Sequence, residues 1–249
     1  MKNLDTNKYF EIGNGAVPII LSSPHGGYKK PKDILNKIKG VQNADKNEYL
    51  ISKQIIKVLK DLYNMDVFFI LSKIHRCKID FNRPPRSFSA FNHSSIEAKM
   101  IHQYYHDIIE KFYINCIETF DKCLFIDLHG FTKPKKDLED YPDIIFGNLF
   151  GNTLKIYENS KTNKTTYYWG FSELIKELST KSFTLDDGLA MRDFNLSYSG
   201  GYITHKFYKK EKSNAFQLEV SNYIRDDFKL MKKFINAFVS AIYKCLKNN

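Results

Sequence analysis

Two histidines follow apolar runs and precede glycine: His25 in "SPHGG" and His129 in "FIDLHG". In open α/β sheets, ligands bind outside the carboxyl ends of parallel strands, so residues that follow different strands can meet there. Two histidines and a carboxylate are a common ligand set for a catalytic zinc, which keeps one position open for water. We therefore expect a metal site at one sheet edge, where Gly26 and Gly27 let the chain turn and leave room for a ligand.

Two acidic residues accompany these histidines. Asp127 precedes His129 by two positions, so in a strand both side chains point to the same face; Asp127 can then position the histidine or cap the next turn. Glu219 lies inside the apolar run "FQLEVS", where a carboxylate costs free energy unless it is paired or functional. The residues alone leave open whether Glu219 is a general base or half of a structural ion pair.

The stretch "HRCKIDFNRPP" carries the basic groups of the candidate site. Arg76 and Arg83 offer rigid guanidinium groups that can bind a carboxylate through two hydrogen bonds, and Asn82 adds amide donors. Asp80 could pair with either arginine. A surface loop with one salt bridge would contribute little to stability, and the pattern by itself leaves that alternative open beside an anion-binding pocket.

The elements that must position these groups are indicated by hydrophobic periodicity. Short apolar runs predict buried strands at 17–23, 66–74, 123–130, 143–148 and 214–221. Apolar residues spaced three and four apart predict helices at 48–63, 94–119, 172–180 and 226–246. Strands that alternate with helices predict an α/β fold in which helices cover both faces of a sheet.

Length, charge and cysteine usage narrow the class of protein. A chain of 249 residues without repeats or linkers is expected to form one domain, 1–249. Its formal net charge of +10 favours anionic partners, but the lysines are scattered, so we expect no nucleic acid partner. Without an apolar signal segment, a membrane span or a CxxC pair, a cytoplasmic location is expected, with no membrane partner.

Taken together, "SPHGG", "RCKIDFNRPP", "FIDLHG" and "GGYITHKF…AFQLEVS" resemble the N-formylglutamate amidohydrolase-like family. The resemblance spans 17–223 and lies in the order and intervals of the motifs. It implies a three-layer sandwich, with a central mixed β-sheet flanked by helices, related to the phosphorylase/hydrolase-like folds of zinc carboxypeptidases and aspartoacylase. It also implies one Zn²⁺ per chain and a small anionic N-acyl amino acid or peptide substrate, and leaves the oligomeric state open.

The resemblance also implies roles for individual residues. His25 and His129 match zinc ligands and Glu219 matches the general base. Arg76 matches an arginine that polarises the scissile carbonyl. The substrate is expected to contact residues of two motifs: Asn82, Arg83 and Tyr202.

The third metal ligand is not fixed by the motifs, because "HGGYKKP" contains no acid. The segment "NADKNEYLIS" offers Asp45 and Glu48 where a helix is expected to begin. Alignment of that helix favours Glu48 over Asp45. An acid in a first helical turn is also favoured by the helix dipole, so either residue has a structural explanation as well.

Other residues are weaker candidates. His102 and His106 are four apart on an expected helix, a spacing that can bind metal, but no glutamate follows the first histidine as in a metalloprotease helix, so we expect an ordinary helix-face pair. His205 stands where the family motif suggests arginine. The segment "LDDGLAMRDF" adds further pocket candidates: Asp186, Asp187 and Arg192.

The expected function is that of a zinc-dependent hydrolase of C–N amide bonds, which cleaves the formyl or acyl bond of an N-acyl acidic amino acid such as N-formylglutamate. One alternative is a carboxypeptidase-like enzyme or peptide amidase that acts on a peptide with a free carboxylate or glutamyl group. The other is a non-catalytic binder of anionic partners, which the net charge allows but which would not require two strand-end histidines beside a buried glutamate.

Overall fold

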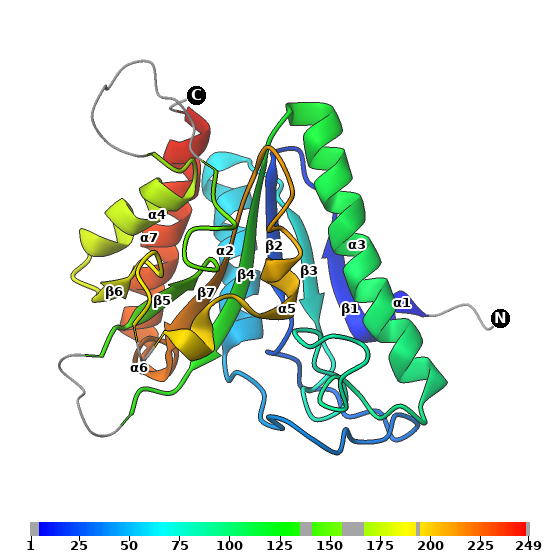
Figure 1. Ribbon diagram of the computed structural model, residues 1–249. Coiled ribbons are helices and arrows are strands. Elements are labelled where there is room, and N and C mark those ends of the chain that lie inside the picture. Colours follow the sequence, from blue (N-terminus) through cyan, green and yellow to red (C-terminus); the bar gives the residue numbers. More distant parts are fainter. Residues whose placement is uncertain (1–4, 135–140, 156–166, 193–194, 248–249) are drawn as a thin grey trace.

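Seven strands form one sheet at the centre of the computed structural model, which describes residues 5–134, 141–155, 167–192 and 195–247 (Figure 1). The strands lie in the order β1-β3-β2-β4-β7-β5-β6. Their bounds are β1 Phe10–Gly13, β2 Ile19–Ser23, β3 Phe68–Ser72, β4 Cys123–Phe131, β5 Ile144–Gly147, β6 Leu185–Asp186 and β7 Ser213–Ser221. Each apolar run that predicted a strand contains one.

The sheet is mixed. Strands β3, β2, β4 and β7 are parallel to one another, whereas β1 pairs antiparallel with β3 and β5 pairs antiparallel with β7. The outer strands β1 and β6 were not expected from the sequence, because each is short and lacks an apolar run. The parallel centre places the carboxyl ends of four strands at one edge.

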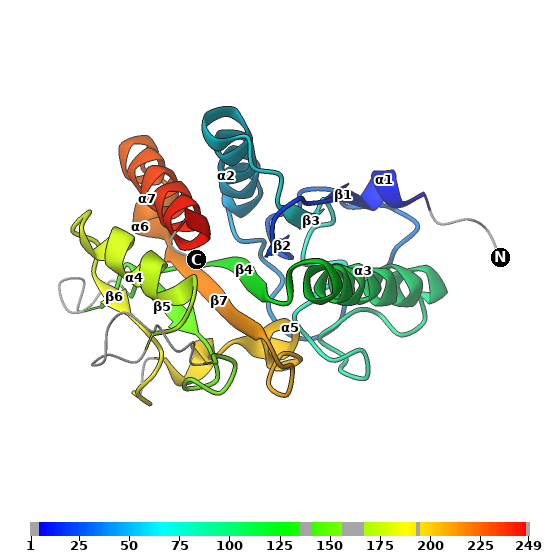
Figure 2. The same ribbon diagram turned by 90° about the horizontal axis from the view of Figure 1, so that it is seen from above.

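Helices cover both faces, as expected for a three-layer sandwich. Four helices match the expected ones to within two residues at each end: α2 Glu48–Tyr63, α3 Ile96–Phe120, α4 Phe171–Ser179 and α7 Phe228–Lys247. The shorter helices are α1 Thr6–Tyr9, α5 Gly201–His205, α6 Asn222–Arg225 and the 3₁₀ turn η1 Leu196–Tyr198. Figure 2 shows α2 and α7 on one side of the sheet and α3 on the other.

Side chains alternate along β4, so this one strand contributes to the cores on both faces of the sheet. Leu124, Ile126 and Leu128 belong to the core that packs against α2, α4 and α7, while Phe125 belongs to the core that packs against α3. Because side chains alternate along a strand, the polar residues at its end share the α3 side with Phe125. The apolar pattern thus sets both the packing of β4 and the direction in which its histidine points.

None of the helices in the described ranges is long and apolar enough to cross a membrane.

Candidate active site

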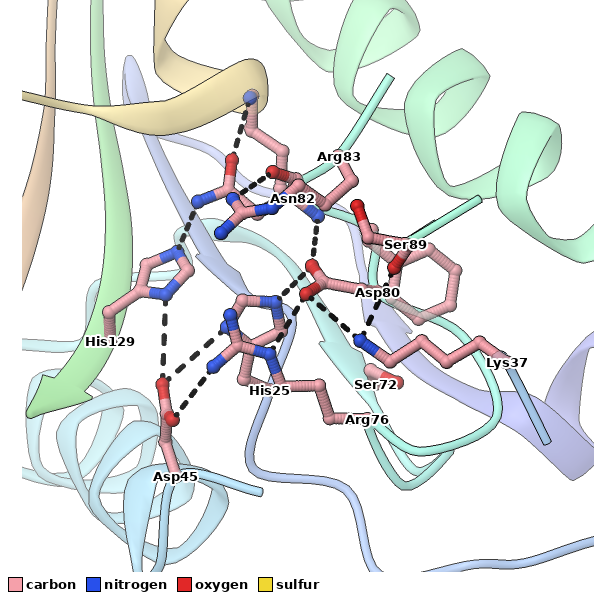
Figure 3. A network of polar contacts seen from close by, with 12 residues as sticks. His25, Lys37, Asp45, Ser72, Arg76, Asp80, Asn82, Arg83, Ser89 and His129 are labelled. Atoms are coloured by element: carbon pink, nitrogen blue, oxygen red, sulfur yellow. Dashed lines mark hydrogen bonds and ion pairs between the residues drawn. The ribbon is translucent and has the colours of Figure 1, made fainter. Parts of the chain in front are cut away.

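Three buried side chains from different segments converge at the carboxyl edge of the parallel strands. His25 follows β2, His129 lies near the end of β4, and Asp45 lies just before α2. One potential ligand atom from each lies within 4.8 Å of the others. Asp45 Oδ2 is 3.5 Å from His25 Nδ1 and 3.7 Å from His129 Nδ1, and Figure 3 shows both imidazoles directed at this carboxylate. The group could hold a metal ion.

A second carboxylate stands behind each imidazole. His25 Nε2 donates to Asp80 Oδ1 at 2.7 Å, and His129 Nε2 donates to Asp127 Oδ2 at 2.9 Å. These bonds orient each ring so that its Nδ1 faces Asp45, as in the carboxylate–histidine pairs of metal sites. The buried Nδ1 of His25 makes no hydrogen bond to any described residue. A buried imidazole nitrogen without a partner at this point is expected of residues that hold a cation.

Asp45, rather than the Glu48 preferred from the sequence, is the acid that the structure brings into this group. Glu48 Oε1 accepts hydrogen bonds from Ser23 Oγ at 2.6 Å and from the His25 backbone N–H at 3.2 Å. Its carboxyl is fully buried, and that burial raises its pKa well above the usual range. Glu48 therefore ties the start of α2 to the end of β2 beneath the site.

The charge of Asp45 is stabilised where it lies. Burial alone would raise the pKa of its carboxyl, but the neighbouring His129 and His25 rings and the nearby charge of Arg76 outweigh burial and hold that pKa well below the usual range. The Gly130 backbone N–H also donates to Asp45 Oδ2 at 3.1 Å. The carboxylate is thus ionised and oriented between the two rings.

Asp80 is the centre of a buried polar network (Figure 3). Besides the bond from His25, its carboxylate accepts from Arg76 Nε at 2.9 Å, from Lys37 Nζ at 3.5 Å and from the Asn82 backbone N–H at 3.0 Å. Of the two arginines considered from the sequence, Arg76 is the one that pairs with it. Lys37 was not anticipated, because a lysine 43 residues away in an irregular segment carries no local signal of its burial.

Glu219 lies opposite His129 in the register of β4 and β7. Burial raises its pKa to about 7, against the opposing effect of the His129 charge. Its Oε1 accepts a hydrogen bond from Gln217, whereas its buried Oε2 makes none. No ion pair within the described ranges involves Glu219, so the structural ion-pair alternative lacks support, and a pKa near neutrality suits a general base.

A cavity of about 670 Å³ opens over this group. It is lined by seven of the residues singled out from the sequence: His25, Asp45, Arg76, Asn82, Arg83, His129 and Glu219. Among the lining residues that were missed are Tyr198, Gln217 and Arg225. Gln217 could have been found, since it precedes Glu219 by two positions and so shares its face of the strand.

Asn82 and Arg83, the expected carboxylate-binding pair, differ in how far their side chains are already engaged by other residues. Asn82 Oδ1 accepts from the Ile203 N–H at 2.9 Å and its Nδ2 donates to Gln217 Oε1 at 3.2 Å, so its amide mainly fixes the surrounding loops. Arg83 Nη1 donates to the Asn82 carbonyl at 2.8 Å. Among the ion pairs of the described ranges none involves Arg83, which leaves it a cation without a counter-charge in the cavity wall.

Tyr202 does not line the cavity. Its ring packs 5.2 Å from the His106 ring, measured between centroids, and lies below Lys206 Nζ, because α5 turns this side chain toward α3. Tyr198, four residues earlier, lines the cavity instead. Burial raises the pKa of its phenol above the usual range, so this hydroxyl stays protonated and can donate a hydrogen bond.

The remaining candidates lie outside the cavity lining. His102 and His106 are buried rather than on an exposed helix face, and their Nε2 atoms donate at 3.0 Å to the carbonyls of Arg83 and Phe81. His205 contacts the Ser199 carbonyl at 3.4 Å.

Residues 185–192 of the "LDDGLAMRDF" segment form a turn of their own. Asp186 accepts from the Gly188 N–H at 2.6 Å and from Asn195 Nδ2, and the Arg192 N–H donates to Asn195. Asp187 Oδ1 accepts from the Leu189 N–H at 3.0 Å. These contacts engage the Asp186 and Asp187 carboxylates and the Arg192 backbone N–H within the segment and with Asn195, which follows it.

The glycines of "SPHGG" serve the chain rather than a ligand, which corrects the expectation drawn from the sequence. A Cβ atom at Gly26 would collide with the backbone N of Tyr49, at the start of α2. At Gly27 it would collide with the carbonyl of Ile74. The two glycines therefore let the segment after β2 pass close to neighbouring backbone and so hold His25 in place.

These features define the class of fold: an α/β protein with polar side chains gathered at the carboxyl edge of a mixed sheet. In particular, the fold is similar to the crystal structure of N-formylglutamate amidohydrolase from Ralstonia eutropha JMP134, with a TM-score of 0.66, 15% identity, and coverage of 94% of this chain and 97% of that one. A gene product of Agrobacterium tumefaciens matches with a TM-score of 0.64 and 13% identity, over 96% of this chain and 95% of that one.

No family model matches the chain, and no curated protein does. The similarity to solved structures confirms the expected fold, and at this level of identity it extends to the fold alone.

Proposed function

We propose that this protein is a zinc-dependent amidohydrolase that cleaves the formyl or acyl amide bond of an N-acyl acidic amino acid such as N-formylglutamate. The observation that carries the proposal is one cavity that combines a buried His25–Asp45–His129 group with Glu219 and Arg83, neither of which forms an ion pair with a described residue. The fold that the chain shares with an N-formylglutamate amidohydrolase supports the same reaction class.

The proposed zinc ligands are His25, Asp45 and His129, with Asp45 taking the place first given to Glu48. The free Nδ1 of His25 and the carboxylates behind both rings support a cation at this point. A zinc ion bound there would polarise the scissile carbonyl and make water acidic enough to react near neutral pH.

Glu219 would act as the general base. Its Oε2 is free to take the proton of the attacking water, and a pKa of about 7 lets the same atom return the proton to the leaving amine nitrogen. Arg76 lies beside the proposed ligands, with Nη1 3.4 Å from Asp45 Oδ1. Held by Asp80, its guanidinium would donate hydrogen bonds to the oxyanion that forms as the carbonyl is attacked.

Arg83 would bind the carboxylate of the substrate. A guanidinium without a carboxylate partner in the cavity wall favours an anionic ligand that can accept two hydrogen bonds. Asn82 would keep Arg83 and α5 in place through its bonds to the Ile203 N–H and to Gln217.

The substrate assignment is tested with N-formylglutamate, N-formylaspartate and the uncharged N-formylleucine, assayed with the zinc-loaded wild type and with Arg83→Met. We expect turnover of the acidic substrates and a KM for them at least about tenfold higher in the variant, as for the loss of a charge-assisted pair. Equal KM values for acidic and uncharged substrates would contradict the role of Arg83.

The size of the cavity favours a second candidate, a peptide with a free carboxylate or glutamyl group. A volume of about 670 Å³ is typical of pockets that hold drug-sized ligands and exceeds what a formyl group needs. Short peptides ending in glutamate therefore belong in the same panel. Cleavage of the peptides without cleavage of N-formyl amino acids would reverse the order of the two candidates.

A further inference from the structure

Arg225, the last residue of α6, is a buried cation whose hydrogen-bond partners are all backbone carbonyls. It is 4% exposed. Nε donates to the Val220 carbonyl at 2.9 Å, Nη2 donates to the Phe131 carbonyl at 3.0 Å, and Nη1 donates to the Lys46 carbonyl. Of the ion pairs in the described ranges, none includes this guanidinium. A buried charge costs free energy unless its hydrogen-bond donors are satisfied. The three carbonyls that meet at this guanidinium therefore indicate that the structure requires its donors in these positions.

Each of the three carbonyls lies within two residues of a proposed functional side chain. Val220 follows Glu219 on β7, Phe131 lies two residues after His129 on β4, and Lys46 follows Asp45. One planar group therefore bonds to the strand of the general base, to the strand of a histidine ligand and to the loop that carries the carboxylate ligand. The rigid fork of arginine can bridge three segments in this way, whereas the single ammonium of lysine cannot match all three directions.

The loop with Asp45 needs such a connection. Residues 24–47 contain no helix or strand longer than an isolated bridge, so regular hydrogen bonding does not fix their position. The Asp45 N–H donates to the His25 carbonyl at 3.1 Å, and the Asn47 side chain donates to the Arg225 carbonyl at 2.7 Å. Bonds thus run in both directions between this loop and α6.

Gly130 explains how the guanidinium reaches this position. A Cβ atom at residue 130 would collide with Nε and Cζ of Arg225. The glycine after His129 is therefore required so that Arg225 can lie against the end of β4. It also gives a second way to disturb the contact, because Gly130→Ala displaces the guanidinium while leaving the arginine in the sequence.

We propose that Arg225 is a positioning residue that fixes Asp45 relative to the ends of β4 and β7 and thereby sets the affinity of the site for zinc. The zinc part of this inference rests on the proposed function, whereas the placement of the loop does not. Both can be measured on the full chain.

The first readout is amide hydrogen exchange of the metal-free protein. Arg225→Lys and Arg225→Met are expected to exchange the Asp45 and Gly130 amides at least tenfold faster than wild type, with the exchange of α3 and α7 unchanged. Arg86→Met, which replaces an exposed arginine outside the cavity, serves as the matched control. Unchanged exchange at both amides in folded Arg225 variants would overturn the proposal whether or not the wild type binds zinc.

The second readout is zinc affinity, measured by competition with a chromophoric chelator. We expect a loss of about 10- to 100-fold in both Arg225 variants and in Gly130→Ala, the scale for residues that support metal ligands. A purely structural role would lower the melting temperature of the metal-free protein and leave zinc affinity unchanged, which would overturn the proposal. Absence of zinc binding by the wild type would refute the proposed function, and the exchange data would then decide the role of Arg225 alone.

Discussion

The structure contains two buried histidine pairs that have nearly the same ring separation but different surroundings. The ring centroids of His25 and His129 are 4.6 Å apart, and those of His102 and His106 are 4.7 Å apart. In the first pair Nε2 donates to carboxylates, and the Nδ1 atoms face Asp45. In the second pair Nε2 donates to backbone carbonyls, and none of the metal-type groups within the described ranges includes either ring.

The pKa values follow this difference. Burial would lower the pKa of His129, but the charge of Asp127, the hydrogen bond that His129 donates to it and the nearby Asp45 carboxylate outweigh burial and raise that pKa well above the usual range. Burial lowers the pKa of His102 to about 4 and that of His106 to about 2. The carboxylates around His129 thus favour a positive charge on its ring, whereas burial disfavours one on His102 and His106.

The largest expected effect separates the two pairs directly. His25→Ala and His129→Ala are each expected to abolish zinc binding, because each removes a proposed ligand. His106→Gln is the matched change in the other pair and is expected to retain zinc, since glutamine can still donate to the Phe81 carbonyl. Metal content by mass spectrometry is the measurement. Loss of zinc from His106→Gln, with the strand-end variants unaffected, would invert the comparison.

Glu219→Gln tests the catalytic role proposed for the site that contains the first histidine pair. The variant keeps the size of the side chain and removes the proton acceptor, so turnover should fall by a factor of about 10²–10⁴ while zinc stays bound. The rate is measured with the best acidic substrate of the panel under saturating conditions. Full activity in this variant would remove Glu219 as the general base.

Asp80→Asn tests how much the carboxylates behind the imidazole rings contribute to zinc affinity. The substitution removes the charge that His25 Nε2, Arg76 and Lys37 share, so we expect zinc affinity to fall about 10- to 100-fold. Asp186→Asn is a suitable control because it alters another buried carboxylate, outside the cavity lining. Equal zinc affinities in the two variants would show that the charge of Asp80 is not required.

The second pair is expected to make stability depend on pH. Because folding holds the pKa of His102 and His106 below the ordinary value of 6.5, the unfolded chain binds more protons than the folded one below pH 6.5. Their contribution is present above pH 6.5 and is lost as the pH falls toward about 4 for His102 and about 2 for His106. Between pH 7 and pH 5 each histidine should lower the free energy of unfolding by about 1–2 kcal/mol.

Urea unfolding at pH 7 and at pH 5, with chelator, gives the loss in free energy of unfolding for wild type and for the double variant His102→Gln, His106→Gln. The difference between the two losses measures this effect. The variant should lose less stability between the two pH values. An identical loss in both proteins would mean that the two imidazoles do not titrate as their surroundings indicate.

The sequence predicted the strand-end histidines well, because each follows an apolar run whose end is easy to locate. It also predicted the four long helices and the five buried strands. These features depend on local periodicity. The direction of Glu219 follows from the same alternation along β7, which explains why this residue lines the cavity.

What the sequence could not determine lies in irregular segments and distant contacts. The choice between Asp45 and Glu48 depends on how the loop ends at Asn47, which adopts a left-handed backbone conformation (φ 65°) just before α2. Lys37 and Arg225 meet the site across long stretches of chain, so no local pattern marks them. Tyr202 was placed near the substrate, but the turn of α5 directs it toward α3.

The central claim is that Asp45 joins the two strand-end histidines to hold one zinc per chain. The most direct test is the zinc content of wild type, Asp45→Asn and Glu48→Gln after incubation with zinc and removal of excess metal. We predict about one zinc per chain in wild type and in Glu48→Gln, and its loss in Asp45→Asn. Retention of zinc by Asp45→Asn together with its loss from Glu48→Gln, or no zinc in the wild type, would contradict the account.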